Sequence, residues 1–285
     1  MSLLPVDTPE SPFVSTGWLA ANLGAPDLVI VDASWHMPNT DRNGASEFLA
    51  EHIPGAVHFD IDAIADHTTP LPHMLPDAHS FAVAVGALGV GDGLRIVVYD
   101  SLGLFSAPRV WWTFRAFGAR EVKLLDGGLP KWKAEGLPLE DGPARRPPAT
   151  FTPRFDHSLV ADIERVDQAL KSGSAQVLDA RQTARFRGEA PEPRAGLPSG
   201  HMPGAFNLPH ATLVRDGRLV PPDEIAEAVK ASGLDLSRPV ITSCGSGVSA
   251  AILWVALEII GRRPLALYDG SWTEWGASGK EIAVG

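Results

Sequence analysis

The sequence repeats itself at about half its length, and this constrains the fold more than any other feature. Three short motifs occur once in each half, in the same order. They are Val31-Asp32-Ala33 with Leu178-Asp179-Ala180, Pro54-Gly55-Ala56 with Pro203-Gly204-Ala205, and Asp126-Gly127-Gly128 with Asp269-Gly270-Ser271. The paired motifs are 147, 149 and 143 residues apart. So long a period predicts two tandem copies of one domain rather than a solenoid of short repeats.

A segment rich in proline separates the two copies. Residues 141–150 contain three prolines and one glycine, which disfavour regular secondary structure. We therefore predict an N-terminal domain over residues 1–142, a linker over 143–157 and a C-terminal domain over 158–285.

Short apolar runs alternate with helical patterns in both copies. The expected strands are residues 28–31, 95–99 and 121–125 in the first copy, and 176–178, 239–242 and 265–268 in the second. Helices are expected over 223–231 and 250–260, and Gly261 closes the second of these. This alternation predicts an α/β fold in each domain, with a mostly parallel sheet flanked by helices.

Composition excludes several classes of protein. The 24 Lys and Arg residues against 34 Asp and Glu residues give a net charge of −10, so no nucleic-acid partner is expected. The longest apolar stretch, residues 248–257, is far shorter than the ~20 residues that span a bilayer. The N-terminal residues fit neither a secretory signal nor a transit peptide. We therefore expect a cytoplasmic protein with no membrane partner.

The single cysteine, Cys244, follows a predicted strand and precedes an apolar helix. Ligands bind beyond the carboxyl ends of parallel strands. Gly245 and Gly247 allow the backbone to curl, so that successive N–H groups can point at one centre, and the helix dipole adds positive potential there. We expect a thiolate nucleophile near neutral pH. The alternative is a buried structural cysteine.

Protein tyrosine phosphatases place a cysteine in a similar loop. Their chemistry needs an arginine six positions after the cysteine to hold phosphate through two hydrogen bonds. Position 250 is alanine in this chain, and no arginine lies between Cys244 and Arg262. Phosphoryl transfer is therefore disfavoured.

The loop Cys244-Gly245-Ser246-Gly247-Val248-Ser249 and the duplicated motifs resemble the two-domain rhodanese superfamily. Within it, the loop is similar to the Cys-Gly-Ser/Thr-Gly-Val-Ser/Thr loop of 3-mercaptopyruvate sulfurtransferases. Thiosulfate sulfurtransferases usually carry basic residues directly after the cysteine. The resemblance covers nearly the whole chain and implies two rhodanese-like domains. In the N-terminal copy Asp100 stands opposite Cys244, so that domain is expected to be catalytically silent.

The resemblance also implies which residues bind substrate. A family pattern matches residues 185–194 and places the two substrate arginines on Arg185 and Arg194, whose guanidinium groups can grip a carboxylate and an adjacent carbonyl. Arg181 and Arg187 are expected at the surface or behind the site. The loop residues Gly245, Gly247, Val248 and Ser249 are expected to contact the substrate.

A second match lies in the first domain, at residues 59–62 and 73–76. It implies a relay of Asp62, His73 and Ser246. The aspartate would fix the histidine tautomer, and the histidine would polarise the serine hydroxyl beside the thiol. Because Asp and His are common in loops, two unrelated surface residues are the alternative.

The resemblance implies a sulfurtransferase that moves sulfur from 3-mercaptopyruvate onto Cys244 as a persulfide and releases pyruvate. A thiol such as thioredoxin, or cyanide, would then accept the sulfur. No metal or organic cofactor is implied, since the cysteine itself carries the sulfur. Two alternatives remain open: a thiosulfate:cyanide sulfurtransferase, and a non-enzymatic persulfide carrier or redox sensor.

Overall fold

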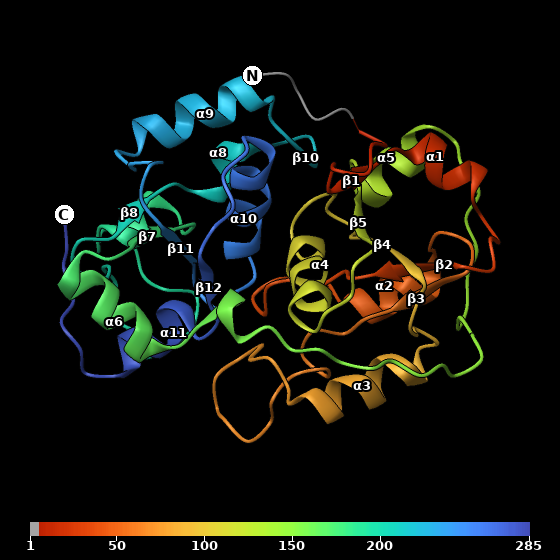
Figure 1. The fold of residues 1–285 in the computed structure, drawn as a ribbon, viewed down its shortest axis with the longest axis horizontal. Helices are drawn as coiled ribbons and strands as arrows, with labels where there is room; N and C mark the ends of the chain where they lie inside the picture. Colours follow the sequence, from red (N-terminus) through yellow and green to blue (C-terminus); the bar gives the residue numbers. More distant parts are fainter. Residues whose placement is uncertain (1–5) are drawn as a thin grey trace.

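The computed structural model describes residues 6–285 and shows two domains of the same architecture (Figure 1). The N-terminal sheet has the strand order β1-β5-β4-β2-β3, and the C-terminal sheet has the matching order β6-β12-β11-β7-β8. All neighbouring strands of these two sheets run parallel. The repeat and the α/β fold class are confirmed.

Helices flank both sheets. The N-terminal domain contains β1 (Phe13–Val14), α1 (Thr16–Ala21), β2 (Leu28–Asp32), α2 (Gly44–Ala50), β3 (Ala56–His58), α3 (Ala78–Ala87), β4 (Arg95–Tyr99), α4 (Ala107–Ala116), β5 (Val122–Leu125) and α5 (Gly128–Ala134). The C-terminal domain contains η1 (His157–Leu159), β6 (Val160–Ala161), α6 (Ile163–Ser172), β7 (Gln176–Asp179), α7 (Thr183–Phe186), β8 (Phe206–Asn207), α8 (His210–Leu213), the hairpin β9 (Val214–Arg215) and β10 (Arg218–Leu219), α9 (Pro222–Ala231), β11 (Val240–Ser243), α10 (Ala250–Ile259), β12 (Ala266–Tyr268) and α11 (Ser271–Ala277).

The six predicted strands and both predicted helices are present, with ends that differ by at most one residue. Helix α10 ends at Ile259, and Gly261 follows with φ +75°, the left-handed conformation expected after a helix. Every residue from Ala250 to Leu257 is buried. An apolar surface all round the helix produces this burial.

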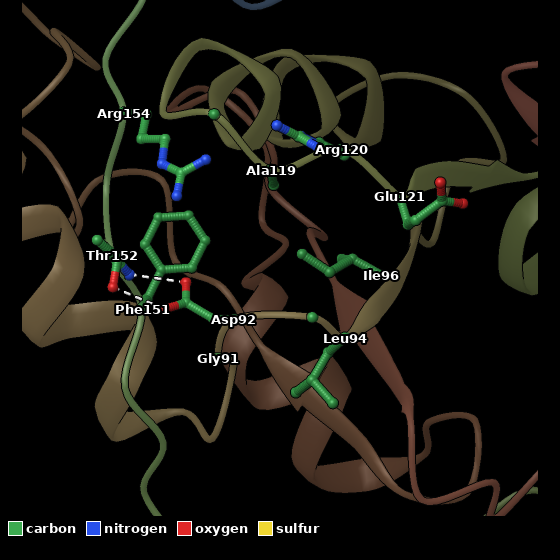
Figure 2. Close-up of a pocket in the computed structure, with 12 residues that line it drawn as sticks. Gly91, Asp92, Leu94, Ile96, Ala119, Arg120, Glu121, Phe151, Thr152 and Arg154 are labelled. Atoms are coloured by element: carbon green, nitrogen blue, oxygen red, sulfur yellow. Dashed lines mark hydrogen bonds between the residues drawn. The ribbon is translucent and has the colours of Figure 1, made fainter.

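The segment between the domains is extended and packs along the N-terminal domain. Residues 141–156 are all described, and none of them belongs to a helix or a strand. Phe151 is buried and Thr152 bonds to Asp92, beside a cavity of about 380 Å³ where β4 begins (Figure 2). The boundaries at residues 142 and 157 remain a prediction.

Helices α4 and α10 lie side by side at the centre of the molecule and join the two domains (Figure 1). The rings of Trp112 and Trp254 approach to 6.3 Å between centroids. Arg115 forms an ion pair with Glu258 across the same contact. Both helices follow the central strands of their sheets, so this contact brings the two strand-end loops together. No helix within residues 6–285 is long and apolar enough to cross a membrane.

Candidate active site

Cys244 lies directly after the central strand β11, at the edge of the sheet where parallel strands end. It is buried, with 2% of its surface exposed. The cysteine loop, residues 243–249, borders a cavity of about 540 Å³ that both domains line. Trp35 and Phe105 come from the N-terminal domain and Arg194 from the C-terminal domain. The cavity is therefore an interdomain site with the thiol in its wall.

The backbone N–H groups of the cysteine loop divide into two sets. Those of Cys244 and Gly247 donate to the Ser271 hydroxyl, at 3.2 and 3.1 Å, and that hydroxyl donates to the carbonyl of Tyr268. Among the described residues, the N–H groups of Gly245, Ser246, Val248 and Ser249 have no acceptor. Fewer N–H groups are therefore available to a bound anion than the sequence predicted, because the Ser271 hydroxyl accepts from two of them.

The amino end of α10 adds to this cradle. Within the described chain, no side chain caps the helix at Ser249. Uncapped N–H groups at a helix start carry partial positive charge and bind anions. The site can therefore stabilise negative charge on sulfur bound to Cys244.

Arg194 is one of the two arginines that the resemblance implies for substrate binding. It lines the cavity, and its Nη2 is 3.1 Å from Nε2 of His73. Burial lowers the pKa of the Arg194 guanidinium, while the nearby Cys244 and Asp62 act in the opposite direction. A guanidinium held this close to the thiol can bind an anionic substrate beside it.

Arg185 also lines the cavity, and the buried carboxylate of Glu192 holds it in place. Its Nε and Nη2 both donate to Oε2 of Glu192. A Cβ placed on Gly245 would lie 3.4 Å from Nη2 of Arg185, so the guanidinium is directly over the cysteine loop. Part of the positive charge of Arg185 is therefore already compensated.

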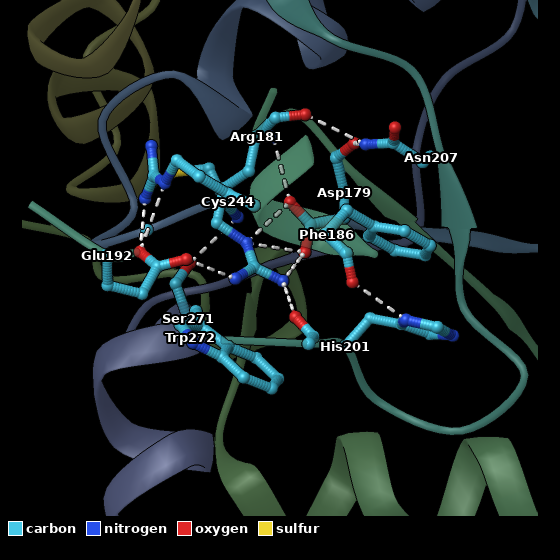
Figure 3. A network of polar contacts seen from close by, with 12 residues as sticks. Asp179, Arg181, Phe186, Glu192, His201, Asn207, Cys244, Ser271 and Trp272 are labelled. Atoms are coloured by element: carbon cyan, nitrogen blue, oxygen red, sulfur yellow. Dashed lines mark hydrogen bonds and ion pairs between the residues drawn. The ribbon is translucent and has the colours of Figure 1, made fainter. Parts of the chain in front are cut away.

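Arg181 takes the second of the two positions expected for it, because it is buried behind Glu192 and Arg185 rather than at the surface. It is 2% exposed and lies between Asp179 and Glu192, with Nη2 2.7 Å from Asp179 and Nη1 2.8 Å from Glu192 (Figure 3). A buried guanidinium needs such partners. It supports Glu192, which in turn orients Arg185. Arg187 is exposed, as expected.

The structure brings Asp62 and His73 together but gives His73 a different second partner. Nδ1 of His73 lies 2.8 Å from Oδ1 of Asp62. Its Nε2 faces Arg194, and no hydrogen bond joins His73 to Ser246 within residues 6–285. Because Nε2 must accept from Arg194, the proton is on Nδ1, toward Asp62. Ser246 is buried and lines the cavity beside Cys244.

Electrostatics agree with a neutral His73. Burial lowers the pKa of His73, although Asp62 acts in the opposite direction. The hydrogen bond with His73 lowers the pKa of Asp62, and the indole N–H of Trp35 also donates to that carboxylate, at 2.7 Å. The resulting arrangement is Asp62, then neutral His73, then Arg194.

Sequence reasoning missed several residues around the site. Arg109 and Asp269 form a buried ion pair beneath the cysteine loop, Ser271 orients that loop, and Glu192 holds Arg185. Asp269 and Ser271 belong to a repeated motif, so their position in the fold could have been suspected. Nothing in the local sequence marks Arg109. In the described part of the chain, no three His, Cys, Asp or Glu residues are arranged to hold a metal ion.

Comparison with known proteins identifies the family. The family model described as "Rhodanese-like domain" matches residues 15–135 and 162–278. The chain is 46% identical to the 3-mercaptopyruvate sulfurtransferase of Escherichia coli strain K12 over 266 residues, which is 93% of this chain and 95% of that protein. It is 42% identical to the thiosulfate sulfurtransferase of Bos taurus over 270 residues, which is 92% of this chain and 91% of that one.

A solved structure gives the same result. The crystal structure of an Escherichia coli 3-mercaptopyruvate sulfotransferase superposes with a TM-score of 0.85 at 44% identity, and the match covers 92% of this chain and 99% of that one. This chain is a member of the rhodanese family, with two rhodanese-like domains.

Proposed function

We propose that this protein is a 3-mercaptopyruvate sulfurtransferase. The Cys244 thiolate attacks the thiol sulfur of the donor, and a sulfur–sulfur bond forms as the carbon–sulfur bond breaks. The electron pair of the broken bond leaves with the carbon as the enolate of pyruvate, which takes up the proton of the donor thiol. Cys244 retains the sulfur as a persulfide. No metal or organic cofactor enters these steps.

One observation supports this proposal above all. Cys244, the free N–H groups of its loop and the guanidinium of Arg194 all border one interdomain cavity. The N–H groups and the start of α10 suit an anionic persulfide, as an oxyanion hole suits an oxygen. Arg194 and Arg185 suit the carboxylate and carbonyl of a 2-oxo acid. The name of the 46% identical relative agrees with this substrate.

Thiosulfate is the second candidate donor, and the name of the Bos taurus relative supports it. The residues next to Cys244 favour mercaptopyruvate, because Gly245 and Ser246 supply no cation to neutralise a second negative charge. Two opposite unit charges at 4 Å attract by about 4 kcal/mol at an effective dielectric constant of 20. The absence of a cation should therefore weaken the binding of the thiosulfate dianion. Arg185 neutralises little of the second negative charge of thiosulfate, since it already forms an ion pair with Glu192.

The second half-reaction passes the outer sulfur to an acceptor thiol such as thioredoxin, or to cyanide. The acceptor attacks the outer sulfur, the sulfur–sulfur bond breaks, and the Cys244 thiolate leaves. We propose the cytoplasm as the location, since a catalytic free thiol suits a reducing compartment. A persulfide carrier without turnover would stop after the first step.

Steady-state kinetics with both donors test the proposal. We expect pyruvate release from 3-mercaptopyruvate with a kcat/KM well above that for thiocyanate formation from thiosulfate and cyanide. Many pyruvates per Cys244 would exclude a carrier. A kcat/KM for thiosulfate equal to or above that for mercaptopyruvate would replace the substrate and leave the family unchanged.

A further inference from the structure

Each domain holds an aspartate of the other through one arginine. Asp269 binds Arg109, which belongs to α4 of the N-terminal domain, with 2.6 Å between Oδ1 and Nη2. Asp126 binds Arg218, which belongs to β10 of the C-terminal domain, with 2.8 Å between Oδ2 and Nη2. The two aspartates occupy the same position in the repeated motif. Only the Arg109 pair lies beneath the cysteine loop.

Arg109 also binds two backbone carbonyls, whereas Arg218 binds only Asp126 within the part of the chain that the structure describes. Arg109 is 2% exposed, and its Nη2 also donates to the carbonyl of His73, at 2.6 Å. Its Nη1 donates to the carbonyl of Gly247, at 3.4 Å. The other oxygen of Asp269 accepts from the N–H of Leu75, at 2.8 Å. One guanidinium thus connects the His73 segment, the cysteine loop and Asp269.

Both backbone segments that Arg109 holds contain a residue with positive φ. His73 has φ +61°, which is uncommon for a residue with a side chain, so surrounding contacts must maintain it. Gly247 has φ +78°, and a Cβ there would lie 2.7 Å from Nη1 of Arg109. The glycine is therefore required for the close approach of the arginine as well as for the turn.

We propose that Arg109 is a positioning residue for sulfur transfer, supplied to the catalytic domain by the silent one. Arg109 acts through its hydrogen bonds to the backbone carbonyls of Gly247 and His73. The first fixes the position of the cysteine loop relative to the cavity, and the second fixes the orientation of His73. His73 in turn holds Arg194 over the cavity. This inference rests on the proposed function for its kinetic test.

The test compares Arg109→Lys with Arg218→Lys in the full chain. Lysine keeps the charge opposite each aspartate but lacks the planar fork that reaches several acceptors. For Arg109→Lys we expect kcat for pyruvate release to fall by about 10- to 100-fold, the size of effect that ~1 Å misplacement causes. For Arg218→Lys we expect kcat within about twofold of wild type, because its half-exposed ion pair contributes little.

Two further measurements are made on both variants. The rate at which iodoacetamide alkylates Cys244 reports the reactivity of the thiol, and the melting temperature shows where each variant is folded. Alkylation should fall with kcat in Arg109→Lys, at a temperature where both variants are folded, and be unchanged in Arg218→Lys. Gly247→Ala gives a second route. Its Cβ would lie 2.7 Å from Nη1 of Arg109 and 2.9 Å from the backbone carbonyl oxygen of Asp269, so it should displace both groups and reduce kcat as well.

Three outcomes would overturn the inference. They are a wild-type kcat in Arg109→Lys, equal losses in both lysine variants, and a wild-type kcat in Gly247→Ala. Absence of pyruvate release in the wild type would instead contradict the proposed function, and the alkylation rates would still test Arg109.

Discussion

The loops after the central strands of the two sheets occupy matching positions, but they differ in what accepts hydrogen bonds from their backbone N–H groups. In the N-terminal domain the aspartate loop, residues 100–106, follows β4, and its first side chain fills the position of an anion. The Asp100 carboxylate accepts from the N–H groups of Leu102, Phe105 and Ala107, at 2.9, 2.7 and 2.8 Å. In the C-terminal domain, four N–H groups of the cysteine loop have no acceptor among residues 6–285. One loop holds its own anion, whereas the other can receive one.

The residue that packs behind each loop also differs between the two domains. Gly128 and Ser271 occupy matching positions and have nearly equal φ values, +52° and +50°. Leu129 N–H donates to the carbonyl of Asp100, as Trp272 N–H does to that of Cys244. Only Ser271 carries a hydroxyl, which aligns the cysteine loop. The comparison shows that a duplicated backbone becomes a site through a few side chains.

The β9–β10 hairpin packs against part of the aspartate loop. A Cβ on Gly103 would lie 2.5 Å from the Cα of Gly217, in the turn of the β9–β10 hairpin. The hairpin of the C-terminal domain therefore covers the aspartate loop at Gly103, whereas Cys244 borders the interdomain cavity. The N-terminal domain lines part of the cavity with Trp35 and Phe105, and it contributes Asp62, His73 and Arg109 to the surroundings of the site.

The largest effect is expected when the cysteine is removed from position 244 and placed instead at the matching position 100. Cys244→Ser should abolish pyruvate release and prevent the gain of one sulfur atom in intact mass after donor treatment. Asp100→Cys added to Cys244→Ser should remain inactive, because the silent loop lacks the Ser271 hydroxyl and lies beneath the hairpin. A sulfur adduct on Cys244→Ser alone would remove Cys244 from the mechanism.

The arginines over the cysteine loop should show the next largest effect. Arg194→Ala and Arg185→Ala should each reduce kcat/KM for mercaptopyruvate by about 1–3 kcal/mol in transition-state free energy, the usual cost of losing a hydrogen bond to a charged group. Arg187→Ala is the control, since Arg187 is exposed in the same segment. Equal losses at all three positions would contradict the assignment.

The aspartate loop should matter for stability rather than rate. Asp100→Asn turns an amide N–H₂ toward backbone donors, so the free energy of unfolding should fall by about 1–3 kcal/mol, with kcat nearly unchanged. Denaturant titration measures this. Asp27→Asn, which breaks an exposed ion pair with Arg95 in the same domain, should cost much less. A large loss of kcat in Asp100→Asn would show that the silent loop takes part in catalysis.

The smallest effect concerns pH. Burial lowers the pKa of His73 from its ordinary 6.5, so His73 is neutral at pH 7 and gains a proton only as the pH falls below that value. Protonation converts Nε2 from an acceptor to a donor, which repels Arg194. Wild-type kcat/KM for mercaptopyruvate should therefore decline on the acid side.

His73→Asn is the matched variant, since asparagine tolerates positive φ. Its acid-side decline should be shallower than that of the wild type, over the same pH series. Parallel profiles for the two proteins would assign the decline to another group.

Much of the site could be predicted because its signals are local. The glycines of the cysteine loop, the apolar helix behind it and the strand before it are adjacent in sequence, and their periodicity indicates their structure. The position of Asp100 followed from the repeat. The placement of Arg185 and Arg194 followed from the resemblance to the family and from no pattern of spacing.

The chain by itself determined the duplication and the α/β class, located six strands and two helices, and indicated Cys244 as the candidate nucleophile. Tertiary structure alone decided which polar groups meet. Arg109 binds groups 36, 138 and 160 residues away, and Arg181 is buried because two carboxylates converge on it. Hydrophobic periodicity records which face of an element is buried, but a buried charge selects its partners by three-dimensional proximity and by the cost of leaving any of them unpaired.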